Sequence, residues 1–341
     1  MRVLVTGGAG YIGSHTAVEL LLAGHDAVLL DNLSNSTAAA VDLIEATAGR
    51  RPLFVRGDTR DRELLDQLFA EQQIDAVIHF AALKAVAESC AKPLEYYSAN
   101  ITGTLTLLEA MRAAGCNQLV FSSSATVYGS ENSVPFREDM PLGTATNPYG
   151  STKLVAEGIL RELAAAEPDW SIVLLRYFNV VGAHPGGLLG DNPTVPQNIM
   201  PIICRVAQGR QAELLVTGTD YDTPDGTCVR DYIHVVDLAR GHLKALDYAA
   251  RNTGCEAFNL GTGRGLSVLE LVAAFEAAAG IALPRRAAPR RPGDIPACYA
   301  QADKAERGLG WRAEHSGAAE ICGDVWNYLQ NRDKSQGCVL Y

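Results

Sequence analysis

A chain of 341 residues is long enough for one large domain or for two moderate ones. Hydrophobic residues make up 48% and charged residues 20%, which is ordinary for a globular enzyme. The formal net charge of −10 argues against nucleic acid or an anionic membrane as the main partner. A phosphate-bearing ligand must therefore be met by local backbone amides or by individually placed arginines.

The cysteine pattern and the start of the chain bear on compartment. The 8 cysteines include no Cys-x-x-Cys and no paired Cys/His spacing, which favours reduced thiols and no metal site. The chain begins with an apolar strand-like run, without a leader pattern or an apolar stretch long enough to span a bilayer. We expect a cytoplasmic protein.

The first half alternates short apolar runs with helical patterns. We expect strands at Arg2–Thr6, Ala27–Leu30, Leu53–Arg56, Ala76–Phe80 and Gln118–Ser122. We expect helices at Ser14–Ala23, Arg62–Gln72 and Leu105–Ala114, with Gly24 and Gly115 as the glycines that end two of them. This alternation predicts an α/β fold with a Rossmann-type, doubly wound parallel sheet.

The second half is less regular. It indicates a helix from Tyr149 to Ala165, a strand at Ser171–Phe178, loops at Gly182–Asn198 and Asp220–Gly226, and helices at Val235–Ala250 and Val268–Ala279. We interpret residues 1–178 as a nucleotide-binding domain, to which the chain returns at roughly 228–262. Residues 179–341 then form mainly a smaller, interleaved C-terminal substrate lobe.

A glycine-rich segment lies between the first expected strand and helix. Thr6-Gly7-Gly8-Ala9-Gly10-Tyr11-Ile12-Gly13 satisfies Gly-x-Gly-x-x-Gly, in which glycines let the backbone approach a pyrophosphate at a helix N-terminus. This position predicts dinucleotide binding. Asp31 ends the next strand, where a carboxylate accepts hydrogen bonds from a ribose diol and repels a 2′-phosphate, so NAD is favoured over NADP. Asp31 and Asp58 are also compatible with helix-cap or turn roles.

Tyr149 and Lys153 stand four residues apart on an expected helix, so their side chains share a face. A neighbouring cation lowers the pKa of a phenol, which starts at about 10, and makes it usable as a base. Read alone, such a pair is more often a surface coincidence, and Ser124 alone is more often a strand-end hydroxyl. The nucleotide motif on the same chain favours the catalytic interpretation.

Longer motifs connect these residues. His79 to Val86, Ser122 to Gly129, Arg176 to Asn179, Gly182 to His184 and Val229 to His234 resemble the UDP-glucose 4-epimerase family, within the extended short-chain dehydrogenase/reductases. The resemblance extends from the N-terminus to about Trp326. It implies an isomerase of carbohydrate metabolism, a homodimer with tightly held NAD, which interconverts UDP-galactose and UDP-glucose by transient oxidation at C4.

The resemblance also implies roles for individual residues. Tyr149 takes the proton of the sugar 4-hydroxyl, Ser124 hydrogen-bonds the same oxygen, and Lys153 binds the nicotinamide ribose and lowers the pKa of Tyr149. The residues expected to contact the cofactor are Gly7, Gly10, Tyr11, Ile12, Gly13, Asp31, Asn32, Asn35, Ser36, Asp58, Thr59, Phe80, Ala81, Lys84, Ser122, Tyr149, Lys153 and Tyr177. Those expected to contact the UDP-sugar are Lys84, Ser124, Ala125, Thr126, Tyr149, Phe178, Asn179, Asn198, Arg230, Arg291, Asp294 and Cys298.

The arginines suit a diphosphate because the guanidinium fork meets its oxygens bidentately, although isolated arginines are more often solvated surface charges. Two residues depart from the family pattern. Thr217 stands where the family commonly has an aromatic side chain near the uracil, which predicts weaker base stacking. Cys298 stands where members restricted to plain sugars have tyrosine, and a small residue there predicts that N-acetylated UDP-sugars are also accepted. Cysteine is also a common filler of core gaps. Tyr299 is the next residue, so a shift of one position in this comparison would put a tyrosine at the selective position.

Other functions share part of this pattern. A related 4,6-dehydratase would need an Asp-Glu pair where this chain has Ala125-Thr126, and those residues cannot serve as the acid and base for losing water. A UDP-glucuronate decarboxylase shares the same cofactor and tyrosine. A non-catalytic NAD-sensing module would share only the fold and the glycine loop.

Overall fold

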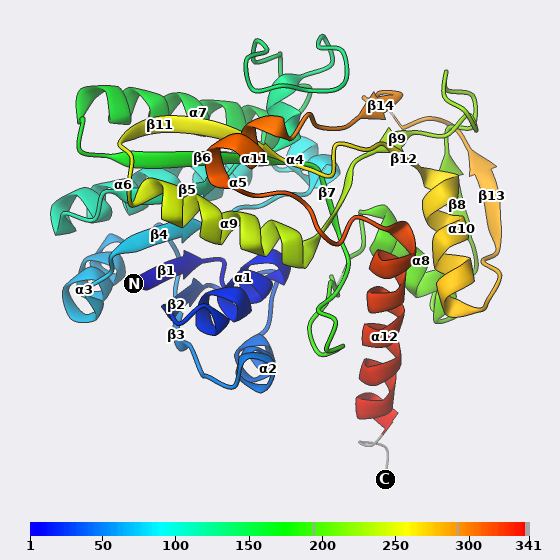
Figure 1. Cartoon of the computed structure of the whole chain (residues 1–341), viewed down its shortest axis with the longest axis horizontal. Helices are drawn as coiled ribbons and strands as arrows, with labels where there is room; N and C mark the ends of the chain where they lie inside the picture. The colour runs from blue at the N-terminus through cyan, green and yellow to red at the C-terminus, as the bar shows by residue number, and fades with distance from the viewer. Residues whose placement is uncertain (194, 292, 338–341) are drawn as a thin grey trace.

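A parallel sheet forms the centre of the N-terminal two thirds of the chain (Figure 1). The computed structural model describes residues 1–193, 195–291 and 293–337. The 7 strands are ordered β11-β6-β5-β4-β1-β2-β3, and every neighbouring pair is parallel. Their bounds are β1 Arg2–Thr6, β2 Asp26–Asp31, β3 Leu53–Arg56, β4 Ala76–His79, β5 Gln118–Ser122, β6 Ser171–Tyr177 and β11 Gly254–Leu260.

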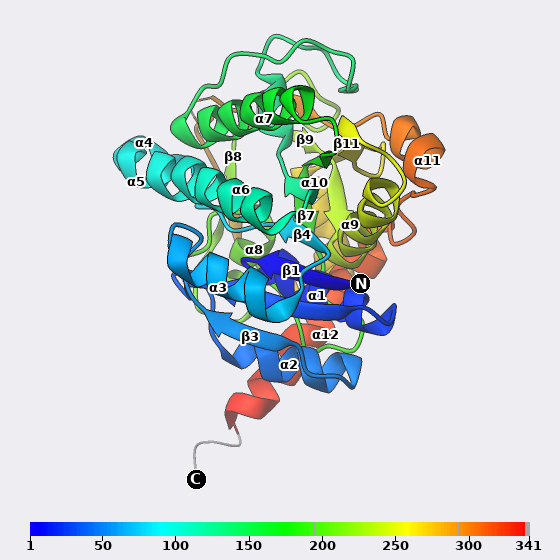
Figure 2. The same ribbon diagram turned by 90° about the vertical axis from the view of Figure 1, so that its left-hand side faces the viewer.

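Helices cover both faces of this sheet (Figure 2). One layer contains α1 Tyr11–Leu22, α2 Ala39–Ala48, α9 Val235–Ala249 and α11 Asp303–Leu309. The other contains α3 Arg62–Gln72, α6 Gly103–Ala114 and α7 Pro148–Ala166. Short helices α4 Val86–Ala91 and α5 Pro93–Tyr97, a π-helical turn Ser98–Thr102 and a 3₁₀ turn Ala125–Tyr128 complete this part.

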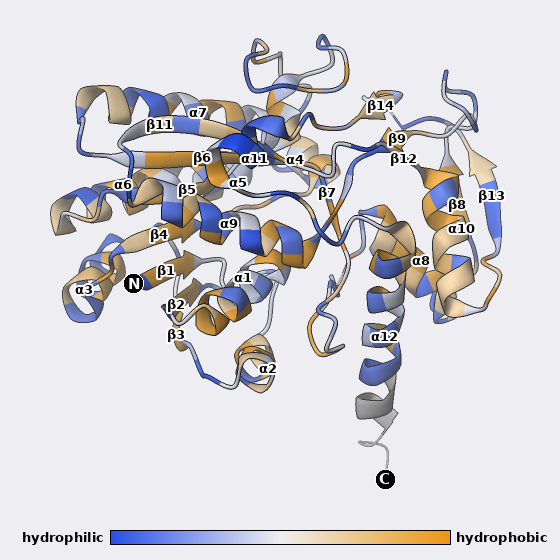
Figure 3. Cartoon of the chain, in the orientation of Figure 1, coloured by the Kyte–Doolittle hydropathy of each residue, from blue (hydrophilic) through white to orange (hydrophobic). Residues whose placement is uncertain are grey.

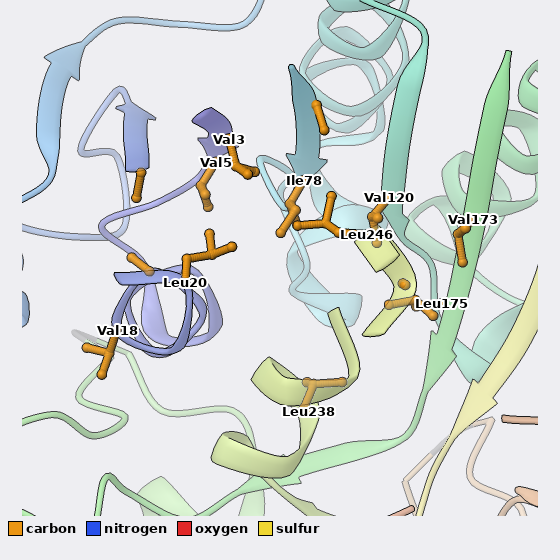
Figure 4. Close-up of a cluster of buried hydrophobic side chains, with 14 of the residues drawn as sticks. Val3, Val5, Val18, Leu20, Ile78, Val120, Val173, Leu175, Leu238 and Leu246 are labelled. Atoms are coloured by element: carbon orange, nitrogen blue, oxygen red, sulfur yellow. The ribbon is translucent and has the colours of Figure 1, made fainter. Parts of the chain in front are cut away.

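The strands supply both layers because successive side chains point to opposite faces. Val3 and Val5 of β1 lie in the core with α1 and α9, as the close-up in Figure 4 shows, whereas Leu4 lies in the core with α3, α6 and α7. All three are 0% exposed, and each buried aliphatic side chain contributes about 1.5–3 kcal/mol. In Figure 3, β4 and β6 at the centre of the sheet are coloured mainly as hydrophobic.

The C-terminal lobe is built from short strands and three helices. Its sheets pair β7 Asn179–Val181 with β10 Tyr232–His234, β8 Leu214–Thr217 with β13 Arg285–Ala288, and β9 Val229–Arg230 with both β12 Leu266–Ser267 and β14 Ala297–Cys298. Its helices are α8 Ile199–Ala207, α10 Val268–Ala279 and α12 Ala318–Gly337. A separate apolar core joins α8, α10 and α12. None of the helices in the described ranges combines the length and apolar character that crossing a membrane requires.

The predicted doubly wound parallel fold is confirmed, while one helix start was wrong. Helix α1 begins at Tyr11, three residues before the predicted Ser14. The residue that caps it is Gly10, which has no side chain to signal a helix start. The Ser14 hydroxyl instead donates to the carbonyl of Tyr11 inside the helix. Gly24 and Gly115 have φ angles of 85° and 69°, the left-handed conformation expected of residues that end helices.

Candidate active site

One large cavity lies along the carboxyl ends of the central strands, where ligands of open α/β sheets bind. Its volume is about 980 Å³, and its wall combines the glycine loop, the ends of β2, β4 and β5, the start of α7 and residues of the lobe. Of the site residues predicted from the sequence, all but Arg291 line it. Arg291 is exposed and lies outside this lining, so its role stays a prediction.

The glycine loop forms a closely packed backbone cradle at one end of the cavity. Gly7 has φ 69°, and a Cβ atom there would lie 2.9 Å from the backbone nitrogen of Ala81. A Cβ atom on Gly13 would lie 2.2 Å from the carbonyl oxygen of Gly7. No side chain caps the start of α1, so its first backbone N–H groups face the cavity uncapped. This cradle fits a dinucleotide pyrophosphate.

Two carboxylates stand beside the cradle. Asp31 is 8% exposed and accepts hydrogen bonds from the backbone of Ala9 (3.0 Å) and Leu33 (2.9 Å) and from the Ser36 hydroxyl (2.8 Å). These bonds hold a negative charge at the end of β2, which suits a ribose diol and disfavours a 2′-phosphate.

Asp58 is held by its neighbours after β3. The Arg60 guanidinium donates to both of its oxygens at 2.8 Å and holds the pKa of Asp58 well below its usual range. The Asn32 amide donates to it at 2.9 Å. The Asp58 carboxylate is therefore ionised and oriented at the cavity wall.

Tyr149 and Lys153 lie on the first turns of α7. The helix begins at Pro148, and the Asn147 side chain caps it by accepting from the Gly150 N–H at 2.9 Å. Lys153 is 4% exposed, and its ammonium donates to the Ser122 carbonyl at 2.5 Å and lies 4.8 Å from the centre of the Phe121 ring. In the predicted helical pair Lys153 is thus buried and reaches the end of β5, while Tyr149 is half-buried.

Burial opposes the lowering of the Tyr149 pKa that the sequence predicts. Burial raises the pKa of Tyr149, and the hydrogen bond with Ser124 lowers it only in part. Burial also lowers the pKa of Lys153 to about 8, against an opposing effect of the Glu157 charge. The ammonium is already engaged by Ser122 and Phe121, so the group that favours the phenolate by direct contact is Ser124.

Serine side chains at the end of β5 lie near Tyr149 and Lys153. Ser124 has an extended backbone (φ −153°) and accepts a hydrogen bond from the Thr126 N–H at 3.2 Å. The hydroxyls of Ser122 and Tyr177 share a hydrogen bond. A phenol, a hydroxyl and an ammonium are therefore gathered in one buried wall, which is the set that removes a proton from an alcohol.

The other end of the cavity is lined by residues from distant segments. Phe178, Asn179, Asn198, Arg230, Asp294 and Cys298 all reach it. The Arg230 guanidinium donates to the Ile295 carbonyl at 2.9 Å and lies 3.5 Å from the Asp294 carboxylate. Thr217 pairs with Ala288 between β8 and β13 and is not part of this wall. Of the two arginines predicted to contact the UDP-sugar, the structure therefore has only Arg230 in the cavity lining.

Cys298 ends β14, and its neighbour Tyr299 directs its side chain elsewhere. Cys298 lines the cavity and packs against a small core with Phe136 and Tyr128. Tyr299 points toward Gly265, where an added Cβ atom would lie 3.2 Å from its ring. The residue on the cavity wall is therefore the small cysteine.

Sequence reasoning missed several lining residues. Phe136, Asn147, Asp191 and Tyr328 also contribute to the wall. Asn147 alone carried a recognisable signal, since an asparagine before Pro148 is a typical helix cap. The other three come from a loop, a second loop and α12, and no local pattern indicates them. In the described ranges 1–193, 195–291 and 293–337, no three His, Cys, Asp or Glu side chains gather as a possible metal site.

Comparisons with known proteins agree with this geometry. Residues 3–261 match the NAD dependent epimerase/dehydratase family. The chain is 56% identical to the UDP-glucose 4-epimerase of Bacillus subtilis over 329 residues, 96% of each protein. It is similar to the crystal structure of UDP-glucose 4-epimerase from Bifidobacterium longum in complex with NAD⁺ and UDP, with TM-score 0.94, 50% identity and coverage of 98% and 99% of the two chains. It is also similar to the UDP-Glc/GlcNAc 4-epimerase of Campylobacter jejuni, with TM-score 0.84, 37% identity and coverage of 97% and 99%.

Proposed function

The chain belongs to the NAD dependent epimerase/dehydratase family, and on that premise we propose that it interconverts UDP-galactose and UDP-glucose, with NAD as its cofactor. The observation that carries this proposal is one cavity that has a dinucleotide cradle at one end and Ser124, Tyr149 and Lys153 in its wall. Residues 1–178, with the return at roughly 228–262, hold NAD, and residues 179–341 mainly hold the UDP-sugar.

The cofactor is held by the backbone amides at the start of α1, by Asp31 and Asp58, and by Lys153 at its nicotinamide ribose. Held there, NAD would supply hydride transfer to and from C4 of the sugar. The remaining cofactor contacts come from the wall of the same cavity, at the ends of β2, β4 and β5.

The chain's own residues move the proton and hold the sugar. Tyr149 takes the proton of the 4-hydroxyl and gives it back after the sugar has turned over. Ser124 hydrogen-bonds the same oxygen and favours the phenolate, which offsets part of the effect of burial on the pKa of Tyr149. Arg230 and Asn179 hold the UDP portion, because the guanidinium fork suits diphosphate oxygens.

Ala125 and Thr126 restrict the chemistry that is possible once C4 has been oxidised. Both lie in the cavity wall directly after Ser124, and neither has a carboxyl group to remove water from a 4-keto sugar. Return of the hydride is the step that these residues leave open. This supports epimerisation over dehydration.

We further propose that N-acetylated UDP-sugars are accepted. Cys298, rather than Tyr299, faces the cavity and leaves room for an acetamido group as the sugar turns. The similar Campylobacter jejuni protein is described as acting on both UDP-Glc and UDP-GlcNAc. Turnover of UDP-galactose without any turnover of UDP-N-acetylgalactosamine would contradict this proposal.

The remaining predictions are a homodimer and a cytoplasmic location. Large exposed apolar side chains support a homodimer: Leu94 and Tyr97 on α5, Leu105 on α6 and Val155 on α7 are 80%, 39%, 41% and 44% exposed. The scattered cysteines support a reducing compartment, because the seven in the described ranges are free thiols.

The test is incubation of the purified protein with UDP-galactose, UDP-N-acetylgalactosamine and UDP-glucuronate, without added NAD, and identification of the products. Conversion of UDP-galactose to UDP-glucose is expected. A matched Tyr149→Phe variant should keep NAD and lose about 10³-fold in kcat, the scale of general acid–base catalysis. An inactive wild-type protein that retains NAD would favour an NAD-sensing module, and a 4-keto, dehydrated or decarboxylated product would favour the related enzymes.

A further inference from the structure

A buried ion pair lies directly behind the Tyr149–Lys153 pair. Glu157 is one helical turn beyond Lys153 on α7 and is 0% exposed. It accepts hydrogen bonds from Arg176 Nε at 2.9 Å and Arg176 Nη2 at 2.6 Å. It also accepts from the hydroxyl of Ser123 at 2.6 Å, the residue next to Ser124.

The hydrogen-bonded network continues from Arg176 to further residues of the cavity wall. Arg176 is 1% exposed and donates to the Tyr128 hydroxyl at 3.1 Å, which donates to the Asn259 amide oxygen at 2.6 Å. Asn259 donates to the Phe136 carbonyl at 2.9 Å, and the Phe136 N–H donates to the Tyr299 carbonyl at 2.9 Å. Phe136 lines the cavity, and Tyr299 comes directly after the lining residue Cys298. The network thus begins beside Ser124 and ends beside Cys298.

A buried ion pair is an inefficient way to stabilise a core. Desolvation of two charges offsets much of their attraction, and apolar replacements of similar volume are often neutral or stabilising. The Glu157 pair therefore invites an explanation other than stability. Both ends of its network lie next to residues that line the reacting site, Ser124 at one end and Cys298 at the other, which points to positioning.

We propose that Glu157 is a positioning residue for the proposed epimerisation: through Ser123 it fixes Ser124 at the end of β5, and it places a negative charge one turn from Lys153. This inference rests on the proposed function. It assigns Glu157 no contact with substrate or cofactor.

The negative charge of Glu157 should affect the pH dependence of kcat, which can be measured. Burial lowers the pKa of Lys153 to about 8, and the Glu157 charge raises it. The other groups near the lysine do not titrate in this range, since burial lowers the pKa of His79 on β4 to about 3 and raises that of Tyr177 on β6 far above neutrality.

The groups around Glu157 itself do not titrate in this range either. Arg161 on α7 lies 3.7 Å from the Glu157 carboxylate. Burial lowers the pKa of Arg176 on β6, but its hydrogen bonds and ion pair with Glu157 outweigh burial and raise that pKa, so Arg176 stays charged throughout the assay. Burial raises the pKa of Cys255 on β11 to about 12 and that of Tyr128 to about 12, so both stay neutral. A shift of the alkaline limb therefore reports on Lys153 and Tyr149.

The first variant is Glu157→Gln, which keeps the shape and removes the charge. We expect kcat to fall about 10- to 100-fold with little change in KM, because a small misplacement of a catalytic group costs about that much. The alkaline limb of the kcat profile should move to lower pH, since Lys153 loses the charge that raises its pKa. The control is Asp237→Asn, a buried carboxylate (1% exposed) on α9 that accepts from the His315 N–H at 2.7 Å. It should lower thermal stability without moving the pH profile.

The double variant Glu157→Gln/Arg176→Gln removes the unpaired guanidinium that the single variant leaves buried. Its thermal stability should recover while the lowered kcat and the shifted alkaline limb persist. A wild-type kcat and pH profile in the double variant would overturn the proposal and leave Glu157 as a structural partner of Arg176. Wild-type protein is assayed alongside. An inactive wild type would count against the proposed function. A normal pH profile in both variants would count against the positioning role alone.

Discussion

The end of the cavity that we propose binds the dinucleotide and the end that we propose binds the sugar nucleotide are built from different kinds of structure. The first uses backbone atoms of one continuous loop, residues 6–13, at the edge of a regular parallel sheet. The second uses side chains from several distant segments, carried by loops and by strands of two or three residues. Backbone contacts depend on conformation and close approach, whereas side-chain contacts depend on residue identity. Substitutions at the two ends should therefore fail in different ways.

The largest effect should come from Gly13→Ala at the dinucleotide end. The new Cβ atom would lie 2.2 Å from the Gly7 carbonyl oxygen and 2.9 Å from the Gly8 Cα atom, so the loop must shift. We expect loss of bound NAD and of all epimerase activity, measured by release of the cofactor from purified protein. The control Gly158→Ala lies on α7 with no atom within 4 Å of the new Cβ, and should keep NAD and gain about 0.5–1 kcal/mol in stability. Normal NAD content in Gly13→Ala would show that the cradle is adaptable.

The next effect should come from Cys298→Tyr at the sugar end. A phenol ring would occupy the space next to Phe136 that an acetamido group needs. We expect kcat/KM for UDP-N-acetylgalactosamine to fall roughly 100-fold and that for UDP-galactose to change little, because pockets discriminate strongly against added bulk that they cannot fit. Tyr299→Phe, whose ring lies beside Gly265 and outside the cavity lining, should leave both values unchanged. Equal loss on both sugars would mean that the residue supports the wall without selecting the substrate.

Arg230→Gln should have a somewhat smaller effect, confined to affinity. Loss of a charge-assisted hydrogen bond costs about 1.5–3 kcal/mol, so the KM of the UDP-sugar should rise about 10- to 100-fold with NAD content unchanged. The control is Arg112→Gln at the end of α6, whose ion pair with Glu167 is exposed and outside the cavity lining. A fall in NAD content with Arg230→Gln would show that the two ends of the cavity do not bind their ligands independently.

This difference also explains how much could be predicted from sequence. The glycine loop, the strands around it and the Tyr149–Lys153 pair obey local rules of spacing and apolar pattern, and the structure has them where they were expected. Phe136 and Tyr328 reach the cavity only through long-range packing of a loop and of α12, which no local pattern encodes. Spacing predicts that Tyr149 lies near Lys153, but it does not predict the burial that raises the pKa of Tyr149.

The same limit applies to the start of α1. Helix-start rules rely on capping side chains. Gly10 has no side chain to cap the helix, so the rules predicted the start at Ser14 instead. The absence of a capping side chain is also what leaves the first N–H groups of the helix available to a phosphate. A helix start that serves a ligand is therefore the kind that sequence rules place least well.

The smallest effect should come from Ser267→Ala, which tests whether stability of the lobe can be changed without changing binding. Ser267 accepts from the Glu270 N–H at 3.1 Å while the Glu270 carboxylate accepts from the Ser267 N–H at 2.7 Å, a capping box for α10. Its removal should destabilise the protein by about 1 kcal/mol in a denaturant titration. The exposed Ser316→Ala is the control and should change little.

The cost of Ser267→Ala should also depend on pH. Burial raises the pKa of Asp225, but hydrogen bonds from Ser267 and Thr227 outweigh it and hold the pKa below its usual range. A lowered pKa in the folded state stabilises the protein above the unfolded value of about 3.9, and this stabilisation is lost as the pH falls through the folded value. The difference from wild type should therefore be largest near neutrality and shrink in acid. Ser267 also pairs with Val229, next to Arg230, so a rise in KM beyond about twofold would show that this cap and the diphosphate contact are coupled rather than independent.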